Sequence, residues 1–255
     1  MKETLGVRPL DSLVSVIMPA FNSEAFIVEA IESVMAQSHS DLELIIVVDG
    51  GHDGTAKIVK SFCELDSRVS AVYHEFNLGI AEARNSGLKI ASGRYIAFCD
   101  SDDAWLPDKL SIQLDLMRKN NIGVCHSSAY LINDRGNSIG VRNIPKRVDL
   151  GMMKKRNFII NSSGILDKSF FNHIAQHNIN SEDYDMWLRL LSFEKISLGA
   201  DKPLVKYRVH VNSITPNLFK SLLWTVNVQR KNGCSWIGIF FGLLYNLKTR
   251  IFIDK

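Results

Sequence analysis

Two hydrophobic patterns alternate along the first 130 residues of the chain. Short apolar runs, rich in β-branched residues, have the pattern of buried parallel strands. They cover residues 14–18, 42–48, 69–73 and 95–99, with a further run around Val124. The segments between them repeat apolar residues at helical spacing and cover residues 27–35, 58–62, 80–90 and 107–119. This alternation predicts βαβ units, and therefore an α/β fold with a mostly parallel, Rossmann-like central sheet and helices on both faces.

An acidic turn follows the strand predicted at residues 95–99. It reads Asp100-Ser101-Asp102-Asp103, and three carboxylates so close together repel one another unless a cation or a ligand compensates them. Ligands of parallel sheets bind at the carboxyl ends of the strands, which is where this turn lies. The pattern therefore favours a site for Mg²⁺ or Mn²⁺, metals that leave positions open for phosphate oxygens. The alternative is an acidic turn that caps the helix beginning near Pro107.

Several common kinds of site are absent from the sequence. It contains neither G-x-G-x-x-G nor G-x-x-x-x-G-K-[ST], which argues against NAD enzymes and P-loop kinases. Its four cysteines form no C-x-x-C pair, which argues against a zinc site and fits a reducing compartment. Residues 1–13 have no apolar run, so we expect no signal peptide and a cytoplasmic protein. The net charge of +3 does not indicate a nucleic-acid partner, and the oligomeric state is left open.

The positive charge is concentrated in two segments. Residues 142–156 contain six basic residues and one acid, and residues 216–255 contain six basic residues and one acid. The rest of the chain is therefore net acidic. A basic segment is usually a solvated surface, but two of them, one beside a strongly apolar run, equally suit an anionic partner.

That apolar run lies in the C-terminal segment, where two helices are predicted beyond Pro216, separated near Gly233. Ten consecutive apolar or glycine residues occupy positions 236–245, whereas a membrane-spanning helix needs about 20. Aromatic residues with basic neighbours suit a helix that lies in the membrane interface. Packing against the catalytic domain and contact between subunits are the alternatives.

Six motifs occur along the chain in a characteristic order. They are Val16-Ile17-Met18-Pro19-Ala20-Phe21-Asn22, the stretch from Gln37-Ser38 to Asp49-Gly50, Asn77-Leu78-Gly79 with Ala83-Arg84-Asn85, residues 91–98 leading into Asp100-Ser101-Asp102, Glu182-Asp183-Tyr184-Asp185-Met186-Trp187-Leu188-Arg189, and Tyr207-Arg208-Val209-His210 followed by Ser213. Over residues 14–213 the chain thereby resembles the inverting glycosyltransferases of family 2, which have the GT-A fold. The Asp100-Ser101-Asp102 sequence resembles the DxD element of that family.

The resemblance implies a GT-A catalytic domain over residues 1–213 and a C-terminal helical extension over residues 214–255. Within the domain, a nucleotide-binding half (about 14–130) would precede an acceptor-binding half (about 131–213). The residues implied to bind the nucleotide-sugar are Pro19, Phe21, Asn22, Asp49, Arg84, Asp100 and Ser101. Asp102 and His210 are implied as ligands of Mn²⁺ or Mg²⁺, which would neutralise charge on the departing diphosphate.

Asp183 is implied as the general base that takes the proton from the acceptor hydroxyl, with Glu182 and Trp187 on the acceptor side. A base opposite the leaving nucleotide implies a single displacement with inversion. Glu182 remains an alternative base, and the acidic residues could simply favour the positive end of a helix. Core packing is the alternative for Trp187, as it is for Trp105.

Three residues leave their roles open. His210 is a structural histidine if it is not a ligand. Arg84 either approaches the diphosphate or pairs with an acid such as Glu82 or Asp49. The family usually has paired aspartates after the second strand, whereas here Val48 precedes Asp49, so a uracil contact would fall to Asp49 or Asp100.

The resemblance also implies a function. It predicts transfer of a hexose from a UDP-sugar, glucose being the first expectation, to a lipid-diphosphate-linked sugar in O-antigen or other surface-polysaccharide assembly. The enzyme would work as a peripheral protein on the cytoplasmic face of the bacterial inner membrane. One alternative is a sugar-nucleotide nucleotidyltransferase, but the loop at residues 19–24 lacks the glycine-rich, basic sequence expected there. The other is a non-catalytic nucleotide-sugar-binding protein, against which the DxD element and Asp183 argue.

Overall fold

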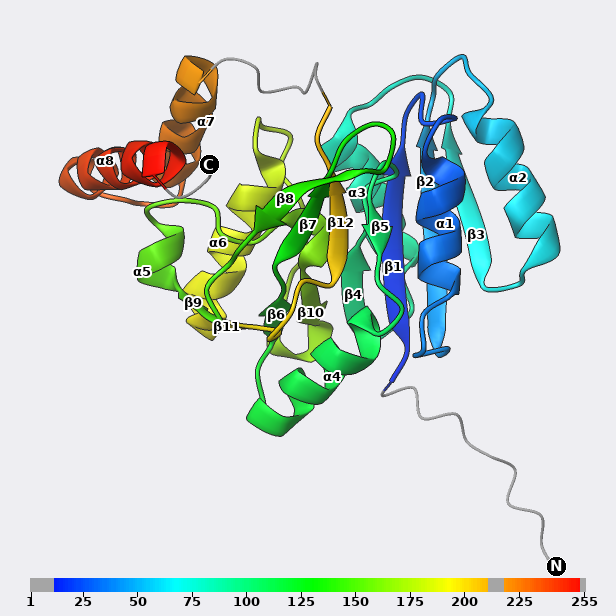
Figure 1. Cartoon of the computed structure of the whole chain (residues 1–255), viewed down its shortest axis with the longest axis horizontal. Helices are drawn as coiled ribbons and strands as arrows, with labels where there is room; N and C mark the ends of the chain where they lie inside the picture. The colour runs from blue at the N-terminus through cyan, green and yellow to red at the C-terminus, as the bar shows by residue number, and fades with distance from the viewer. Residues whose placement is uncertain (1–11, 211–217, 253–255) are drawn as a thin grey trace, which may run out of the picture.

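The structure, a computed structural model, describes residues 12–210 and 218–252 (Figure 1). The helices are α1 (Ile27–Met35), α2 (Thr55–Leu65), α3 (Ile80–Ile90), α4 (Lys109–Asn120), α5 (Leu150–Met153), α6 (Glu182–Glu194), α7 (Leu218–Lys231) and α8 (Trp236–Phe252). The strands are β1 (Val14–Ala20), β2 (Leu42–Asp49), β3 (Val69–His74), β4 (Tyr95–Phe98), β5 (Ala104–Trp105), β6 (Val124–His126), β7 (Ala129–Ile132), β8 (Ser138–Arg142), β9 (Arg147–Asp149), β10 (Ile165–Asp167), β11 (Ile196–Gly199) and β12 (Val205–Arg208). The alternation of strands and helices predicted for the first 130 residues is confirmed.

The central sheet has eight strands in the order β3-β2-β1-β4-β10-β6-β11-β9. The strands from β3 to β4 are parallel to one another, as right-handed βαβ units require. β10 is antiparallel to both of its neighbours and β9 is antiparallel to β11, so the sheet is mixed beyond β4. Because β10 lies between β4 and β6, the second half of the chain completes the sheet begun by the first half.

Helices cover both faces of the sheet (Figure 1). Val14, Val16 and Met18 of β1 belong to one core cluster, which also contains residues of α1, α2 and α4. Ile17 of the same strand belongs to a second cluster with residues of α6, among them Trp187. Successive side chains of a strand point to opposite faces, so an almost entirely apolar β1 needs helices on both sides.

A second sheet brings distant segments of the chain together. Its four strands have the order β5-β12-β7-β8, and β5 pairs with β12 through Val205 opposite Trp105. The residues after β12 are thereby held next to the acidic turn that precedes β5. β5 has only two residues, and the Ile139 and Val141 side chains of β8 are exposed, so neither strand has the buried apolar run by which strands were predicted from the sequence.

The C-terminal extension forms the two predicted helices, α7 and α8. Val228 of α7 and Ile239 of α8 are buried, and the Gln229 side-chain amide donates to the Lys154 carbonyl oxygen (2.7 Å). The basic segment at residues 142–156 therefore contacts the basic C-terminal segment. No helix within residues 12–210 and 218–252 is long and apolar enough to cross a membrane.

Candidate functional site

The loops after β1, β2 and β4 are joined to one another at the carboxyl ends of the strands. The Asn22 side-chain oxygen accepts from the His52 backbone N–H (3.0 Å), which joins the first loop to the second. The Ser23 and Ser101 hydroxyl oxygens lie 2.7 Å apart, which joins the first loop to the acidic turn. Because β2, β1 and β4 are adjacent and parallel, their loops meet at one edge, as the sequence predicted.

The end of β1 presents an aromatic ring. Pro19 is a buried residue of the strand and lies opposite Val47, whereas the Phe21 side chain is 47% exposed. Asn22 has a φ of 47°, so the chain turns sharply directly after Phe21. Phe21 is therefore the exposed apolar side chain of this motif, and Pro19 contributes to the strand.

Asp49, at the end of β2, is already surrounded by donors. Its carboxylate accepts from the Leu78 and Gly79 backbone N–H groups (2.9 Å each) and lies 2.6 Å from His74 Nδ1. It is only 3% exposed, and Val48 beside it is a core residue. In this structure Asp49 orders the loop at residues 77–79, and position 48 offers no polar group.

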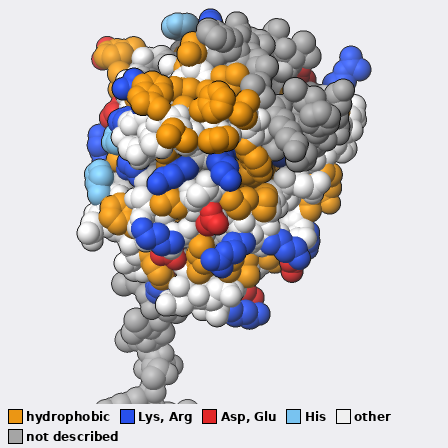
Figure 2. Space-filling view, turned by 90° about the vertical axis from the view of Figure 1, so that its left-hand side faces the viewer, with side chains coloured by type: hydrophobic (Ala, Val, Ile, Leu, Met, Phe, Trp, Pro, Cys, Tyr) orange, Lys and Arg blue, Asp and Glu red, His pale blue; other side chains and the backbone are white. Residues whose placement is uncertain are grey.

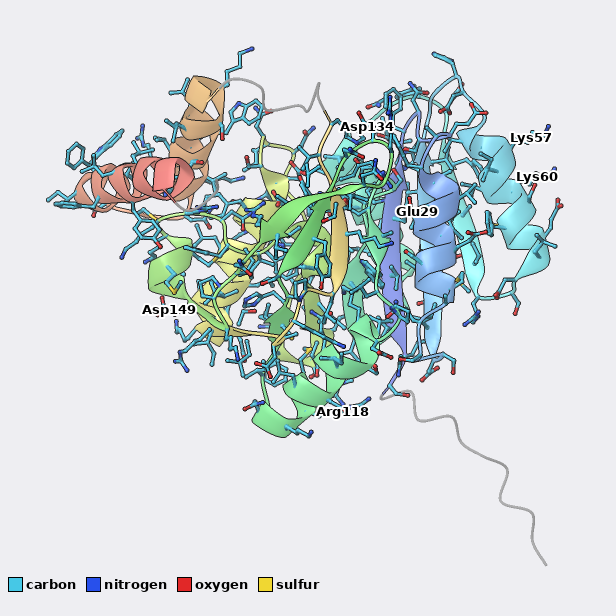
Figure 3. All side chains as sticks on the ribbon, in the orientation of Figure 1. Glu29, Lys57, Lys60, Arg118, Asp134 and Asp149 are labelled. Carbon is cyan, nitrogen blue, oxygen red and sulfur yellow. The ribbon has the colours of Figure 1, made fainter. Side chains whose placement is uncertain are left out.

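Two carboxylates of the acidic turn point toward different partners. Asp100 Oδ1 lies 2.6 Å from Arg84 Nη2, and Asp102 Oδ2 lies 2.9 Å from His210 Nε2. His210 Nδ1 contacts the Asp134 carboxylate, which fixes the orientation of the ring. Asp134, labelled in Figure 3, belongs to the loop between β7 and β8. Burial and the nearby Asp100 charge together raise the pKa of Asp102, although His210 opposes this. A cation would relieve that repulsion.

Asp102 and His210 form a suitable pair of ligands for a metal ion whose remaining ligands come from a substrate. Within the described part of the chain there is no cluster of three or more Asp, Glu, His or Cys side chains suited to hold a metal. Mg²⁺ and comparable ions are commonly bound by one or two protein ligands plus substrate phosphates, so two half-exposed ligands are a suitable donor set. Ser213, the last residue of the late motif, lies outside the described residues.

The third carboxylate, Asp103, is buried. It accepts from the Ser162 hydroxyl (2.5 Å) and from the Arg208 backbone N–H (2.9 Å). The Arg208 guanidinium in turn donates to the Asp102 carbonyl oxygen (2.8 Å) and pairs with Glu29 of α1 (2.6 Å) (Figure 3). Asp103 and Arg208 hold the acidic turn in place, and neither faces the cavity described below.

Replacing Asp103 with alanine is expected to destabilise the protein. The change leaves the Ser162 hydroxyl and the Arg208 backbone N–H without their acceptor in a buried place, which should lower the free energy of unfolding by about 2 kcal/mol or more. Asp103→Asn should cost less, because its amide oxygen can still accept from the Arg208 backbone N–H while its NH2 group donates to the Ser162 hydroxyl oxygen. Urea unfolding of both variants measures this, and an unchanged midpoint for Asp103→Ala would contradict it.

Arg84 joins the two halves of the site. It is 2% exposed and pairs with Asp100 (2.6 Å) and with Glu182 of α6 (2.8 Å), and it also donates to the Gln176 side chain (3.0 Å). Neither Glu82 nor Asp49, the partners considered from the sequence, is among these contacts.

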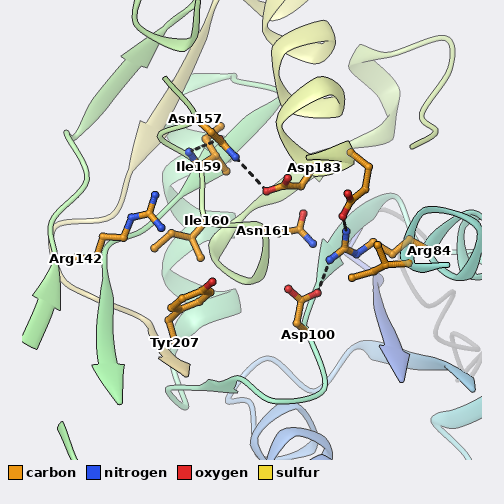
Figure 4. Close-up of a pocket in the computed structure, with 11 residues that line it drawn as sticks. Arg84, Asp100, Arg142, Asn157, Ile159, Ile160, Asn161, Asp183 and Tyr207 are labelled. Carbon is orange, nitrogen blue, oxygen red and sulfur yellow. Dashed lines mark hydrogen bonds and ion pairs between the residues drawn. The ribbon is translucent and has the colours of Figure 1, made fainter. Parts of the chain in front are cut away.

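Asp183 and Glu182 have different surroundings. Asp183 accepts from the Asn157 side-chain amide (3.1 Å), whereas Glu182 is the ion-pair partner of Arg84 (Figure 4). Burial, and secondly the negative charge of Glu182, raise the pKa of Asp183 to about 6. A carboxylate with such a pKa is a suitable proton acceptor near neutral pH. The geometry thus favours Asp183 over Glu182 as the base.

A cavity of about 200 Å³ separates Asp183 from the acidic turn. Asp100, Arg84, Glu182 and Asp183 all line it, and Figure 4 shows Asp100 and Asp183 on opposite sides of it. The second half of the chain contributes six lining residues that sequence reasoning missed: Arg142, Asn157, Ile159, Ile160, Asn161 and Tyr207. Arg142 belongs to the basic segment at residues 142–156 and Tyr207 to the late motif, but nothing in the sequence assigned either residue to the cavity. No sequence pattern indicated a role for Asn157.

Trp187 does not reach this cavity. Its ring is fully buried, its edge meets Phe98 with ring centroids 6.2 Å apart, and it lies against Gly164. Trp187, which the resemblance placed on the acceptor side, is therefore a core residue, the alternative that the sequence left open. Trp105 is likewise 3% exposed. Both are packing residues because each side chain points to a face of the sheet.

Comparison with known proteins agrees with this architecture. An Escherichia coli protein named UDP-Glc:alpha-D-GlcNAc-diphosphoundecaprenol beta-1,3-glucosyltransferase WfgD is 37% identical over 213 residues, which cover 83% of each chain. The crystal structure of S. aureus TarS 1-349 in complex with UDP aligns with a TM-score of 0.66 at 20% identity, covering 84% of this chain and 64% of that one. The mannosyltransferase PcManGT from Pyrobaculum calidifontis, in complex with GDP-Man and Mn²⁺, aligns with a TM-score of 0.57 at 15% identity, covering 83% and 60%.

The two solved structures show that the fold is the GT-A fold. The family model for glycosyl transferase family 2 matches residues 15–181, from β1 to the start of α6. That range contains the linked loops of β1, β2 and β4 and the acidic turn. The chain belongs to glycosyl transferase family 2.

Proposed function

We propose that the protein transfers glucose from UDP-glucose to the GlcNAc of a lipid-diphosphate-linked acceptor, with inversion at the anomeric carbon. The observation that carries the proposal is the cavity in which Asp183 faces the acidic turn across about 200 Å³. The choice of sugar and acceptor is supported by the relative from Escherichia coli, whose name specifies both and which matches over 83% of each chain.

The donor would lie along the linked loops. Phe21 offers its exposed ring to the uracil, Asn22 fixes the loop behind it, and Asp100 lies where the ribose would follow. Ser101, bound to Ser23, keeps the acidic turn against the first loop. Asp49 acts in this scheme as a positioning residue, because its carboxylate already binds the loop at residues 77–79.

Enzymes of this family generally depend on a divalent metal. Asp102 and His210 would hold Mn²⁺ or Mg²⁺ here, and the metal would neutralise charge on the departing diphosphate. Asp134 keeps Nε2 of His210 directed at Asp102 by contacting the other ring nitrogen.

Asp183 would take the proton from the acceptor hydroxyl as its oxygen attacks the anomeric carbon. Arg84 pairs at once with Asp100 and Glu182, so it fixes the distance between the donor side and the start of α6. With the base on the side opposite the diphosphate, the acceptor oxygen forms its bond as the bond to UDP breaks, which inverts the configuration. In this scheme residues 14–130 bind the nucleotide and residues 131–213 bind the acceptor.

A panel of UDP-sugars tests the proposal. Purified protein is incubated with Mn²⁺, each UDP-sugar and a GlcNAc-diphosphate-lipid analogue, and the product linkage is determined by NMR. UDP-glucose should give the highest kcat/KM and a β-linked glucose. An α-linked product would contradict the inverting mechanism, and preference for another UDP-sugar would contradict the choice of glucose. UDP binding without transfer or hydrolysis would support the non-catalytic alternative.

The C-terminal helices would hold the enzyme on an anionic membrane surface. Trp236, Ile237, Phe240 and Phe241 of α8 are between 59% and 71% exposed, and they form one stripe of the helix. Figure 2 shows apolar side chains gathered on this side of the molecule with lysines and arginines beside them. A large apolar stripe beside basic side chains suits the boundary between acyl chains and anionic headgroups. The proposed location is the cytoplasmic face of the bacterial inner membrane.

Replacing Phe240 and Phe241 with serine should weaken binding to anionic liposomes by about tenfold or more, because both rings would otherwise enter the acyl region. Cosedimentation with anionic and with zwitterionic vesicles measures this. Phe193→Ser is the matched control, since Phe193 is 74% exposed on α6. Equal sedimentation of the double variant and the wild type would show that α8 is not an anchor.

A further inference from the structure

A second cavity, of about 140 Å³, adjoins the one that separates Asp183 from the acidic turn. The two cavities share Arg142, Asn157 and Asp183. The second extends away from the acidic turn, because Asp100 and Arg84 line only the first. The C-terminal helices α7 and α8 supply part of its wall. The extension is therefore part of the site region, in addition to any contact with a membrane.

The lining of this second cavity is polar and carries an excess of positive charge. Arg142, at the end of β8, and Arg156, after α5, face one carboxylate, Asp183. Tyr184 is the remaining titratable residue of the lining, and its hydroxyl donates to the Met153 carbonyl oxygen (2.6 Å). Two guanidinium groups around a small cavity are a typical arrangement for binding phosphate oxygens.

The C-terminal helices α7 and α8 add further polar side chains to the lining of the second cavity. Ser221 and Thr225 of α7 and Asn246 of α8 line the cavity. These side chains are polar and uncharged, so they do not repel an anion, and the Thr225 hydroxyl donates to the Ser221 carbonyl oxygen (3.0 Å). The acidic turn lies at the other cavity, so a ligand of the second cavity would lie on the acceptor side.

The position of the cavity agrees with the geometry of an acceptor. An acceptor hydroxyl has to reach Asp183 from the side away from the nucleotide, and the rest of the acceptor then points away from Asp100. That direction leads into the second cavity, whose wall includes Asn246 of α8. The same helix carries the exposed Phe240 and Phe241 on another of its faces, so the cavity that would take a charged group is built in part by the helix that would take an apolar chain.

We propose that the second cavity binds the diphosphate of a lipid-diphosphate-linked acceptor through Arg142 and Arg156. The inference rests on the proposed function for the identity of the acceptor. It adds the site at which the diphosphate is recognised and a role in that site for α7 and α8. The cavity at Asp100 serves the donor and the cavity at Arg156 serves the acceptor.

Arg156 offers the sharper test, because Arg142 also lines the first cavity. The assay compares a short-chain GlcNAc-diphosphate-lipid analogue with a neutral GlcNAc glycoside of the same chain, in the absence of vesicles. Arg156→Gln should raise KM for the diphosphate acceptor by about tenfold or more. KM for the neutral acceptor and for UDP-glucose should stay within about twofold of the wild-type values.

Two further variants show whether the change in KM comes from the loss of a positive charge inside the cavity. Arg156→Lys should restore part of the affinity, because it keeps the charge. Arg147→Gln removes one charge from an exposed position of the same segment outside the cavity, and should leave KM unchanged. If Arg147→Gln acts like Arg156→Gln, or if Arg156→Gln weakens both acceptors equally, the cavity does not bind a diphosphate. The same conclusion follows if the wild type does not prefer the diphosphate acceptor.

Calorimetry with the diphosphate analogue alone separates this inference from the proposed function. Binding that Arg156→Gln weakens and Asp183→Asn preserves supports the cavity even if UDP-glucose is not the donor. If transfer from UDP-glucose is equally efficient to acceptors with and without a diphosphate, the proposed function is supported and the cavity assignment is overturned.

Discussion

Transfer is expected to fall by at least about 10³-fold when Asp102 is replaced with alanine, because a metal at the leaving diphosphate contributes several kcal/mol of transition-state stabilisation. The fold should survive. Asp102 is about one-third exposed and its carboxylate contacts the similarly exposed His210 (2.9 Å), so its removal should change the free energy of unfolding by no more than about 1 kcal/mol. Asp103→Ala should instead lower the free energy of unfolding, since that carboxylate of the turn is buried and accepts two hydrogen bonds.

The measurement is kcat/KM with UDP-glucose and the acceptor analogue, with the melting temperature of each variant recorded in parallel. Excess chelator should reduce the wild type to the level of Asp102→Ala, and Mn²⁺ or Mg²⁺ should restore it. Asp201→Ala is the matched control, because Asp201 is exposed and pairs with the exposed Lys146. Full activity in excess chelator would contradict the assignment of Asp102 as a metal ligand.

The second large effect is expected at Asp183. Asp183→Asn keeps the shape of the side chain and removes the proton acceptor, so kcat should fall by at least about 10²-fold. UDP and metal binding should change little, since Asp183 lies across the cavity from the acidic turn. Glu182→Gln is the comparison, because it removes the ion pair with Arg84 and not the base. If Glu182→Gln proves far more damaging, Glu182 is the base.

The same residue predicts a pH dependence. The base is active only when ionised, and the pKa of Asp183 is raised to about 6. The wild-type kcat/KM should therefore be constant above that value and fall about tenfold per pH unit below it. For Asp183→Asn this acidic limb should disappear from the residual activity. A wild-type profile without a transition between pH 5 and pH 7 would contradict the assignment, whatever the mutant rates.

The acidic turn shows which features of the site residue patterns can predict. Its position after a strand predicted a ligand site, and the strand ends do meet there. The pattern could not separate Asp100, Asp102 and Asp103, which are chemically identical. Their partners come from residues 84, 210 and 162, each brought to the turn by a different element. The distinction depends on the long-range contacts of each carboxylate.

The two basic segments illustrate the same limit on a larger scale. Their charge was evident from the sequence, as was the helical character of residues 218–252. Packing of Gln229 against the Lys154 carbonyl oxygen brings the segments together, and only then do Arg142 and Arg156 line one cavity with side chains of α7 and α8. Likewise, the helical pattern around Trp187 did not show which face of α6 meets the sheet.

The sequence by itself determined the α/β class, the parallel half of the sheet, the edge at which its loops gather and the family motifs. These depend on local periodicity and on the direction of βαβ connections, both of which are properties of short segments. Only the tertiary structure decided that β10 enters the sheet beside β4, that Arg84 bridges Asp100 and Glu182, and that Trp187 is buried. The physical reason is that these contacts join residues far apart in the chain, whose meeting depends on how all the elements pack together.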